Sequence, residues 1–323
     1  MSNSRQDSIG AVIIGRNEGA RLVTCLTSVA TQADLVVYVD SGSTDNSVAE
    51  AEALGAKVVL LDTSVHFTAA RARNAGLAHL LDSDTPPTFV QFIDGDCELR
   101  TSWIATARTF LQDHPEAAVV CGRRRERFPD TTLYNWLTDK DWEGPSGQTR
   151  ACGGDALMRV AALEAVGPFN PTLIAGEEPE LCVRLRKAGW TVWRLEAEMT
   201  WHDADMTRFW QWWMRARRAG HAFAEGAMMH GAAPERHYVP SLRRTLIWGM
   251  ALPLAILIGL FFTPWALALA LLWPLKILRL VARGQEPTLA FFLTLGNFAE
   301  ATGVLIYLRK RLSGQRSELI EYK

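Results

Sequence analysis

The segment Thr88-Phe-Val-Gln-Phe-Ile-Asp94-Gly-Asp96 is an apolar run of strand length that ends in two acids one residue apart. Similar runs precede it at Ala11-Val-Ile-Ile14, Leu35-Val-Val-Tyr-Val39 and Lys57-Val-Val-Leu-Leu61. Strands that are apolar throughout are buried on both faces, as in a parallel sheet that helices cover. Between these runs, apolar residues recur at helical spacing, as in Leu22, Cys25, Leu26 and Val29. The chain is therefore predicted to be an α/β protein with a mostly parallel sheet covered by helices.

The pattern continues beyond the two acids. A helix is predicted over Trp103–Leu111 and a strand over Ala117–Cys121, whereas Ala156–Val166 has a helical or mixed pattern. An amphipathic helix over Gly176–Ala188 and a strand over Thr191–Leu195 follow.

The composition excludes several classes of protein. The 323 residues suggest about two domains, or one large domain with an appendage. With 34 Lys and Arg against 35 Asp and Glu, the chain lacks the basic excess of a nucleic-acid surface, so no nucleic-acid partner is expected. A hydrophobic content of 48% excludes a disordered chain. The five cysteines show no metal-ligand spacing and are expected to be reduced, buried thiols. The start, MSNSRQDSIG, lacks the apolar core of a signal peptide, so the first half of the chain is expected in the cytoplasm.

The C-terminal part changes character. No charged residue occurs between Thr245 and Leu275, a run of 31 positions. A straight helix of that length would measure about 46 Å, longer than a hydrocarbon core of about 30 Å. Basic residues flank the run on both sides and favour the cytoplasmic side of a membrane. A hairpin over about 245–281, turning near Thr263-Pro264, is therefore expected, with a helical hairpin in a soluble core as the alternative.

A third apolar segment, at about 288–308, contains Asn297 and Glu300, which a helix lying on the membrane surface would satisfy better than a crossing. We therefore expect an α/β domain over 1–240 and a membrane-associated helical region over 241–323. The chain is expected at the inner, cytoplasmic membrane, with its α/β domain facing the cytoplasm.

The acids Asp94 and Asp96 are the first candidates for chemistry. They follow a buried strand, and ligands of open α/β sheets bind outside the carboxyl ends of the strands. Carboxylates at such a place suit Mg²⁺ or Mn²⁺, although Asp-Gly-Asp is also ordinary turn chemistry. Polar groups also follow the first strand, at Asn17 and Glu18, and the second, at Asp40. A dinucleotide site is not expected, because Gly15-Arg-Asn-Glu-Gly19 lacks the required glycine pattern.

Taken in order, these motifs resemble those of glycosyltransferase family 2, over roughly Ile9 to His202. The family's motifs are matched by the Asn17-Glu18 turn, by Asp40-Ser-Gly-Ser-Thr-Asp45, by Arg73-Asn-Ala-Gly76, by Asp94-Gly-Asp96, by Cys152-Gly-Gly-Asp155 and by Gly176-Glu-Glu-Pro-Glu180. The resemblance implies a GT-A nucleotide-sugar fold and a divalent cation, Mg²⁺ or Mn²⁺, as cofactor.

The resemblance also implies roles for individual residues. Asp96 would ligate the metal, and His202, after the late strand, would complete its ligands. Arg73 would lie near the nucleotide base or the phosphates, with Arg71 as a competitor for that role. The remaining donor-binding residues would be Asn17, Glu18, Asp40, which holds the base, Asp94, which contacts ribose or sugar, and Gly154.

The catalytic base is the least determined of these roles. The acceptor hydroxyl must lose its proton as it attacks the anomeric carbon, so a carboxylate must lie within hydrogen-bond reach. The resemblance maps this base to Glu178. Glu177 is the alternative, because the family's second acid is shorter and Pro179 follows Glu178 in this chain. Acids at this point would also suit the start of a helix without any catalytic role.

The predicted function is transfer of one sugar, with inversion, from a nucleotide diphosphate sugar. The processive Gln-x-x-Arg-Trp pattern is not matched by Gln211-Trp-Trp-Met-Arg215, which favours single-sugar transfer. The expected acceptor is a polyprenyl-diphosphate-linked saccharide in the membrane, as in surface polysaccharide or exopolysaccharide assembly. Three alternatives stay open: a polyprenyl-phosphate sugar synthase, a nucleotidyltransferase and a non-catalytic membrane scaffold.

Overall fold

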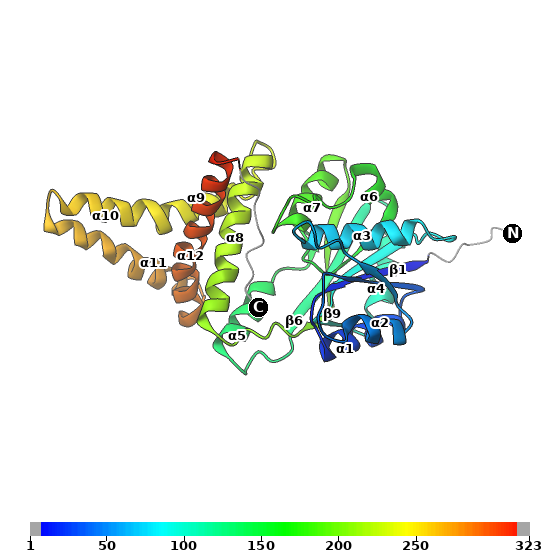
Figure 1. Cartoon of the computed structure of the whole chain (residues 1–323). Coiled ribbons are helices and arrows are strands. Elements are labelled where there is room, and N and C mark those ends of the chain that lie inside the picture. The colour runs from blue at the N-terminus through cyan, green and yellow to red at the C-terminus, as the bar shows by residue number, and fades with distance from the viewer. Residues whose placement is uncertain (1–7, 315–323) are drawn as a thin grey trace. The chain divides into compact units, whose positions relative to one another are not determined.

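A computed structural model describes residues 8–314, and within them the chain forms two compact units, one that ends at Met206 and one that begins at Thr207. Figure 1 shows the course of the chain through both.

The first unit is built on one mixed sheet. Among the described residues its strands run in the order β3-β2-β1-β4-β8-β6-β9-β5, with β7 paired to β9. The strands are β1 (Ile9–Gly15), β2 (Leu35–Asp40), β3 (Lys57–Leu60), β4 (Phe89–Asp94), β5 (Cys97–Leu99), β6 (Ala117–Glu126), β7 (Gly147–Gln148), β8 (Ala156–Arg159) and β9 (Thr191–His202). The helices of this unit are α1 (Ala20–Ala30), α2 (Ser47–Ala53), α3 (Ala69–Leu81), α4 (Trp103–Asp113), α5 (Leu133–Trp142), α6 (Val160–Val166) and α7 (Glu177–Lys187).

The sheet is parallel where the apolar runs predict it to be. β1 lies between β2 and β4, and β2 pairs with β3, all in parallel. In Figure 1, α3, α6 and α7 lie on one side of the sheet, and α1, α2 and α4 lie on the other. The central strands β1 and β4 are buried almost throughout, as expected for strands covered on both faces. The predicted α/β architecture is confirmed.

Several short strands were not resolved from the sequence, among them β8 and β5. The segment Ala156–Val166, expected to be helical or mixed, is the strand β8 followed by the helix α6. β8 lies between β4 and β6 and is antiparallel to both. The three-residue strand β5 was not expected, and it pairs antiparallel with the end of β9. Elements of three or four residues are too short to show a period of their own.

The five cysteines are free and buried, as expected. Cys152 and Cys182 lie with their Sγ atoms 3.7 Å apart.

The second unit is helical. It comprises α8 (Phe209–His230), α9 (Val239–Leu246), the π-helical turn η1 (Ile247–Ala251), α10 (Leu252–Leu260), the 3-10 segment η2 (Pro264–Leu271), α11 (Leu272–Val281) and α12 (Pro287–Leu312). Three stretches are long and apolar enough to cross a membrane, by length and composition: Val239–Leu260, Pro264–Val281 and Pro287–Leu312.

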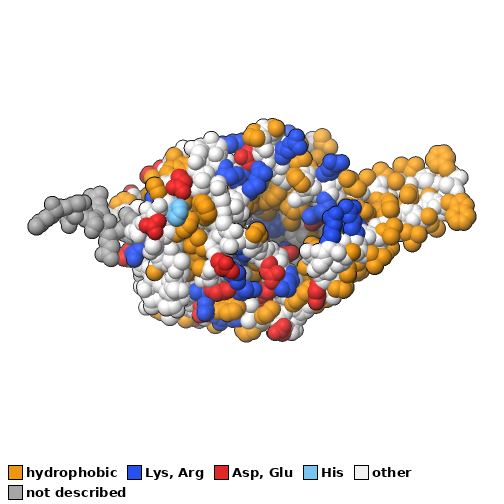
Figure 2. All heavy atoms as spheres, turned by 180° about the vertical axis from the view of Figure 1, so that it is seen from behind, with side chains coloured by type: hydrophobic (Ala, Val, Ile, Leu, Met, Phe, Trp, Pro, Cys, Tyr) orange, Lys and Arg blue, Asp and Glu red, His pale blue; other side chains and the backbone are white. Residues whose placement is uncertain are grey.

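The first two of these stretches form a hairpin that turns between Leu260 and Pro264. At the turn, Phe261, Phe262 and Trp265 are more than four-fifths exposed. Figure 2 shows hydrophobic side chains covering this hairpin. Exposure of so many apolar side chains to water is unfavourable, so the hairpin is suited to a lipid environment.

The third stretch, α12, packs along α8 within the same unit. A Cβ on Gly303 would lie 1.9 Å from the Arg217 carbonyl oxygen, and one on Gly220 would lie 1.9 Å from that of Glu300. The charge on Glu300 is satisfied by Arg244, 2.9 Å away, and by the Thr245 hydroxyl. Asn297 is buried and donates to two carbonyl groups of its own helix. The polar groups of this segment therefore find partners inside the unit.

Candidate active site

The carboxyl ends of three neighbouring strands place polar groups at one edge of the sheet. The register pairs Gly15 of β1 with Asp40 of β2, and Ile14 with Asp94 of β4. The turn after β4 is held against β1 by a hydrogen bond of 2.8 Å from the Gly95 N–H to the Ile14 carbonyl. The predicted groups after β1, β2 and β4 therefore share one edge.

Asp96 and His202 meet although they are far apart in the sequence. The strand β5 begins directly after Asp96, and its first residue, Cys97, pairs with His202 at the end of β9. This pairing brings His202 Nε2 to 3.0 Å from Asp96 Oδ2, with both side chains buried. The unforeseen strand β5 is thus what joins the two residues expected to hold a metal.

The side chains at this point fit a divalent cation. Burial, together with the charge of Arg124, lowers the pKa of His202 to about 4, so the imidazole is neutral at pH 7 as a metal ligand must be. Its Nδ1 is buried and makes no hydrogen bond to any residue that the structure describes. Ligand atoms of Asp96, Cys97 and His202 lie within 4.8 Å of one another. Burial raises the pKa of the Cys97 thiol well above its usual value, so Asp96 and His202 are the better ligands.

Arg73 joins the donor-side acid to the two candidate bases. Its guanidinium is buried and lies 2.8 Å from Asp94 Oδ1, 2.8 Å from Glu177 Oε1 and 3.5 Å from Glu178 Oε1. Arg71, the competitor, binds the carbonyl groups of Asp62, Val65 and His66. The structure therefore brings Arg73, not Arg71, into the group of predicted site residues.

The two glutamates differ in their surroundings. Both begin α7, whose preceding residue, Gly176, has φ +80°. Glu177 is buried against Arg73, whereas Glu178 makes the longer contact. Burial, and then the neighbouring charge of Glu177, raises the pKa of Glu178 to about 7. A carboxyl group with this pKa can accept a proton near neutral pH, as a general base must.

Gly154 lies where Arg73, Asp94 and Glu178 converge. A Cβ at this position would lie 2.7 Å from Arg73 Nη2, 3.1 Å from Asp94 Oδ2 and 3.1 Å from Glu178 Oε1. The loop can approach these three side chains only because it carries a glycine here.

Asn17 and Asp40 shape the neighbouring loops. The side-chain oxygen of Asn17 accepts from the Thr44 N–H at 2.7 Å, and the backbone N–H of Asn17 donates to Ser43 Oγ at 2.9 Å. Asp40 Oδ2 accepts from the N–H groups of Gly42 and Ser43, both at 2.9 Å. Glu18 forms an ion pair with Arg21 at 2.8 Å. These predicted donor-binding residues therefore build the loop walls beside Asp94 and Asp96.

Two residues of the site, one buried and one partly buried, were not singled out from the sequence. Asp155 is fully buried, and Arg124 of β6 lies 2.7 Å from it and 3.7 Å from Asp94. The Arg124 guanidinium lies 5.3 Å from the centre of the Trp142 ring, which is 4.6 Å from the ring of His202. The only signals were local: Asp155 closes the Gly-Gly loop, and Arg124 is the middle one of three consecutive arginines that follow the apolar part of β6.

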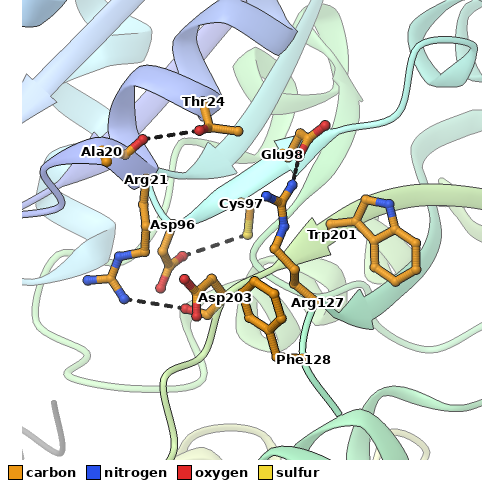
Figure 3. A pocket seen from close by; sticks show the side chains of 10 residues that line it. All are labelled: Ala20, Arg21, Thr24, Asp96, Cys97, Glu98, Arg127, Phe128, Trp201 and Asp203. Carbon is orange, nitrogen blue, oxygen red and sulfur yellow. Dashed lines mark hydrogen bonds and ion pairs between the residues drawn. The ribbon is translucent and has the colours of Figure 1, made fainter. Parts of the chain in front are cut away.

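A cavity of about 200 Å³ adjoins Asp96 (Figure 3). Phe128 and Trp201 contribute aromatic walls, and Arg21, Arg127 and Asp203 contribute charged groups. Figure 3 shows Arg21 reaching the Asp203 carbonyl and Arg127 reaching Glu98. The cavity leaves room for a small polar group beside the predicted metal ligands.

Comparison with known proteins agrees with this geometry. Residues 11–166 match the sequence model of the family described as Glycosyl transferase family 2. An uncharacterized glycosyltransferase of Rickettsia conorii is 48% identical over 60 residues, which are 19% of this chain and 21% of that protein. The match thus spans about a fifth of the length of the rickettsial relatives.

Two further proteins are similar over longer stretches. The succinoglycan biosynthesis protein ExoA of Rhizobium meliloti is 26% identical over 210 residues, covering 61% of this chain and 63% of that protein. Among solved structures, the mannosyltransferase PcManGT from Pyrobaculum calidifontis, in complex with GDP-Man and Mn²⁺, has a TM-score of 0.56 at 19% identity. That similarity covers 94% of this chain and 86% of PcManGT, and at this level of identity it shows a shared fold.

Proposed function

Residues 11–166 match the model of glycosyltransferase family 2, and from that premise we propose that the chain transfers one sugar, with inversion, from a nucleotide diphosphate sugar to an acceptor. The observation that supports the proposal most is the meeting of Asp96 with His202 beside the Arg73–Asp94–Glu178 group at one sheet edge. The match to this family also favours sugar transfer over the nucleotidyltransferase considered from the sequence.

In the proposed mechanism, Asp96 and His202 would hold a divalent cation, Mg²⁺ or Mn²⁺. The cation would supply Lewis-acid stabilisation of the negative charge on the departing nucleoside diphosphate. Asn17, Glu18 and Asp40 line the nucleotide side, and Asp94, held by Arg73, contacts ribose or sugar. PcManGT, whose fold this chain shares, binds GDP-Man and Mn²⁺, which is consistent with these roles.

Glu178 accepts the proton of the acceptor hydroxyl. The hydroxyl oxygen forms a bond to the anomeric carbon on the face opposite the nucleoside diphosphate, whose bond to that carbon breaks, and its proton passes to a Glu178 carboxylate oxygen. Arg73 holds Glu177 more tightly than Glu178, which leaves Glu178 as the stronger candidate for the base. One displacement of this kind inverts the configuration.

We propose a polyprenyl-diphosphate-linked saccharide as the acceptor. The apolar hairpin supports a membrane location, and the ExoA relative is named for succinoglycan biosynthesis. Because nucleotide sugars are cytoplasmic, the catalytic unit is placed on the cytoplasmic side of the inner membrane. Polyprenyl phosphate itself is the second candidate acceptor, and the same hairpin would bring it to the site.

The test is a transfer assay with the full chain in membranes, a panel of nucleotide sugars and Mn²⁺. Lipid-linked saccharides and polyprenyl phosphate are each supplied as the acceptor in separate assays. We expect transfer that EDTA abolishes and that Asp96→Ala lowers by at least about 10²-fold. Transfer that survives both treatments would remove the metal assignment. Nucleotide-sugar binding without turnover on any acceptor would favour a non-catalytic scaffold.

A further inference from the structure

Asp155 ties together three strands of the site. It precedes β8 directly and is fully buried. Its Oδ1 accepts from the Asp94 N–H of β4 at 3.2 Å, and its Oδ2 accepts from the Thr200 hydroxyl of β9 at 3.0 Å. The same Oδ2 lies 2.7 Å from Arg124 Nη2 of β6. Both carboxylate oxygens are therefore engaged by neighbouring strands, which argues against a direct role on substrate or metal.

The places that Asp155 holds are specific. Asp94 lies two residues before Asp96, and Thr200 lies two residues before His202. In a strand, side chains two residues apart lie on the same face, so holding Thr200 also orients the side chain of His202. The carboxylate thus connects the two strands just upstream of both predicted metal ligands. Downstream of them, the pairing of Cys97 with His202 makes the second connection.

The charge of this arrangement also matters. Arg124 has its shortest ion pair with Asp155 and lies 3.7 Å from Asp94. Asparagine in place of Asp155 would keep the shape of the side chain. It would leave the Arg124 guanidinium with less compensating negative charge. Loss of a buried partner of this kind is strongly unfavourable and moves the remaining charge toward other acids. Here the nearest other acid is Asp94, a predicted donor contact.

We propose that Asp155 is a positioning residue that sets the separation of Asp96 and His202 and thereby the affinity of the site for a divalent cation. The inference rests on the proposed function for the identity of the metal site. Residues that orient metal ligands through hydrogen bonds change metal affinity or activity by about 10–100-fold when they are replaced.

The experiment uses the full chain and Mn²⁺ alone as the probe, with binding measured by calorimetry or by the electron paramagnetic resonance of free Mn²⁺. We expect Asp155→Asn to weaken Mn²⁺ binding by about 10–100-fold and to raise the Mn²⁺ concentration needed for transfer. The matched control is Asp34→Asn. Asp34 also accepts a strand N–H, that of Ile9 at 2.8 Å, but it lies at the amino ends of β1 and β2, away from the site at their carboxyl ends. Asp34→Asn should change thermal stability without changing Mn²⁺ affinity.

Thr200 supplies a second test that survives a folding failure of Asp155→Asn. Thr200→Val removes the hydroxyl and keeps the shape, whereas Thr200→Ser keeps the hydroxyl. We expect Thr200→Val to weaken Mn²⁺ binding by several-fold and Thr200→Ser to bind as the unmodified protein does. Unchanged Mn²⁺ affinity in folded Asp155→Asn, or in Thr200→Val, would overturn the inference. If the unmodified protein binds Mn²⁺ but transfers no sugar, the proposed function fails while these affinities still test Asp155.

Discussion

At Glu178, burial gives a carboxyl group the properties of a base that works near neutral pH. Burial raises its pKa to about 7, and the charge of Glu177 adds to the shift. The sequence predicted both glutamates but left the choice between them open. The motif alone does not show which of the two Arg73 holds and which is left to approach the acceptor. Likewise, Arg71 and Arg73 are indistinguishable as a motif. Two residues apart on a helix, they point in different directions, and only Arg73 faces the site acids.

Replacing Glu178 by Gln keeps the shape of the side chain and removes its ability to take a proton. We expect turnover to fall by about 10²–10⁴-fold while donor affinity stays nearly unchanged. Steady-state rates and calorimetric binding of the nucleotide sugar measure the two effects. An active Glu178→Gln combined with an inactive Glu177→Gln would assign the base to Glu177.

The raised pKa of Glu178 also predicts a pH dependence. A base must be deprotonated to act, so kcat/KM should rise about tenfold per pH unit below a pH of about 7 and level off above it. Glu177→Gln removes a negative charge that raises the pKa of Glu178. It also removes the acid that shares the positive charge of Arg73 with Glu178. The rising limb should therefore move to lower pH in Glu177→Gln. Initial rates across the pH range measure this shift. If the rising limb stays in place, it does not report the ionisation of Glu178.

At the scale of elements, the long apolar strands were predictable, and the short pieces that complete the site were not. β8 has four residues between the Gly-Gly loop and α6, so no period marks it. Yet β8 sits between β4 and β6 and thereby buries Asp155 and places Gly154 against Arg73. The family's Gly-Gly motif pointed to Gly154, but its contacts depend on this long-range pairing.

The loop before β8 offers a matched pair of glycines. Gly154→Ala would place a Cβ 2.7 Å from Arg73 Nη2, whereas a Cβ on Gly153 would meet no atom within 4 Å. Because displacement of positioned groups by about 1 Å can cost about 10²-fold in rate, we expect a loss of that order in Gly154→Ala. Gly153→Ala should retain activity. Equal activities of the two variants would mean that the contact around Gly154 does not govern the chemistry.

The contact between α8 and α12 gives a second pair. A Cβ on Gly303 would lie 1.9 Å from the Arg217 carbonyl oxygen, whereas one on Gly296 would approach only the Trp212 ring, at 3.7 Å. Gly303→Ala must push the two helices apart, and we expect it to destabilise the helical unit by about 1–3 kcal/mol. Gly296→Ala should be neutral or slightly stabilising, because alanine favours a helix. Thermal unfolding in detergent compares the two, and equal melting temperatures would contradict the close packing.

For the whole molecule, the helical unit decides how the enzyme meets the membrane. The hairpin arms Val239–Leu260 and Pro264–Val281 would measure about 33 and about 27 Å as helices, close to a hydrocarbon core of about 30 Å. α12 is also long and apolar enough, but it packs along α8, which carries Arg215, Arg217 and Arg218. A crossing by α12 would also carry Arg309, Lys310 and Arg311 to the outer side, against the usual preference of basic residues. We therefore expect the hairpin to cross and α12 to stay on the cytoplasmic side.

Single cysteines introduced into the full chain can test this topology, because the five native thiols are buried. Ser241→Cys lies at the start of the first arm and Gln285→Cys lies just after the second, each next to basic residues, and both should react only with reagents that reach the cytoplasm. Trp265→Cys lies at the exposed aromatic tip, where tryptophan is typical of a membrane interface, and it should react from the outside. Ser313→Cys, after the basic end of α12, should behave like the two flanks. If Gln285→Cys reacts from the outside while Ser241→Cys does not, the hairpin must be replaced by a single crossing. The acceptor would then have to reach the catalytic unit by a route other than the hairpin.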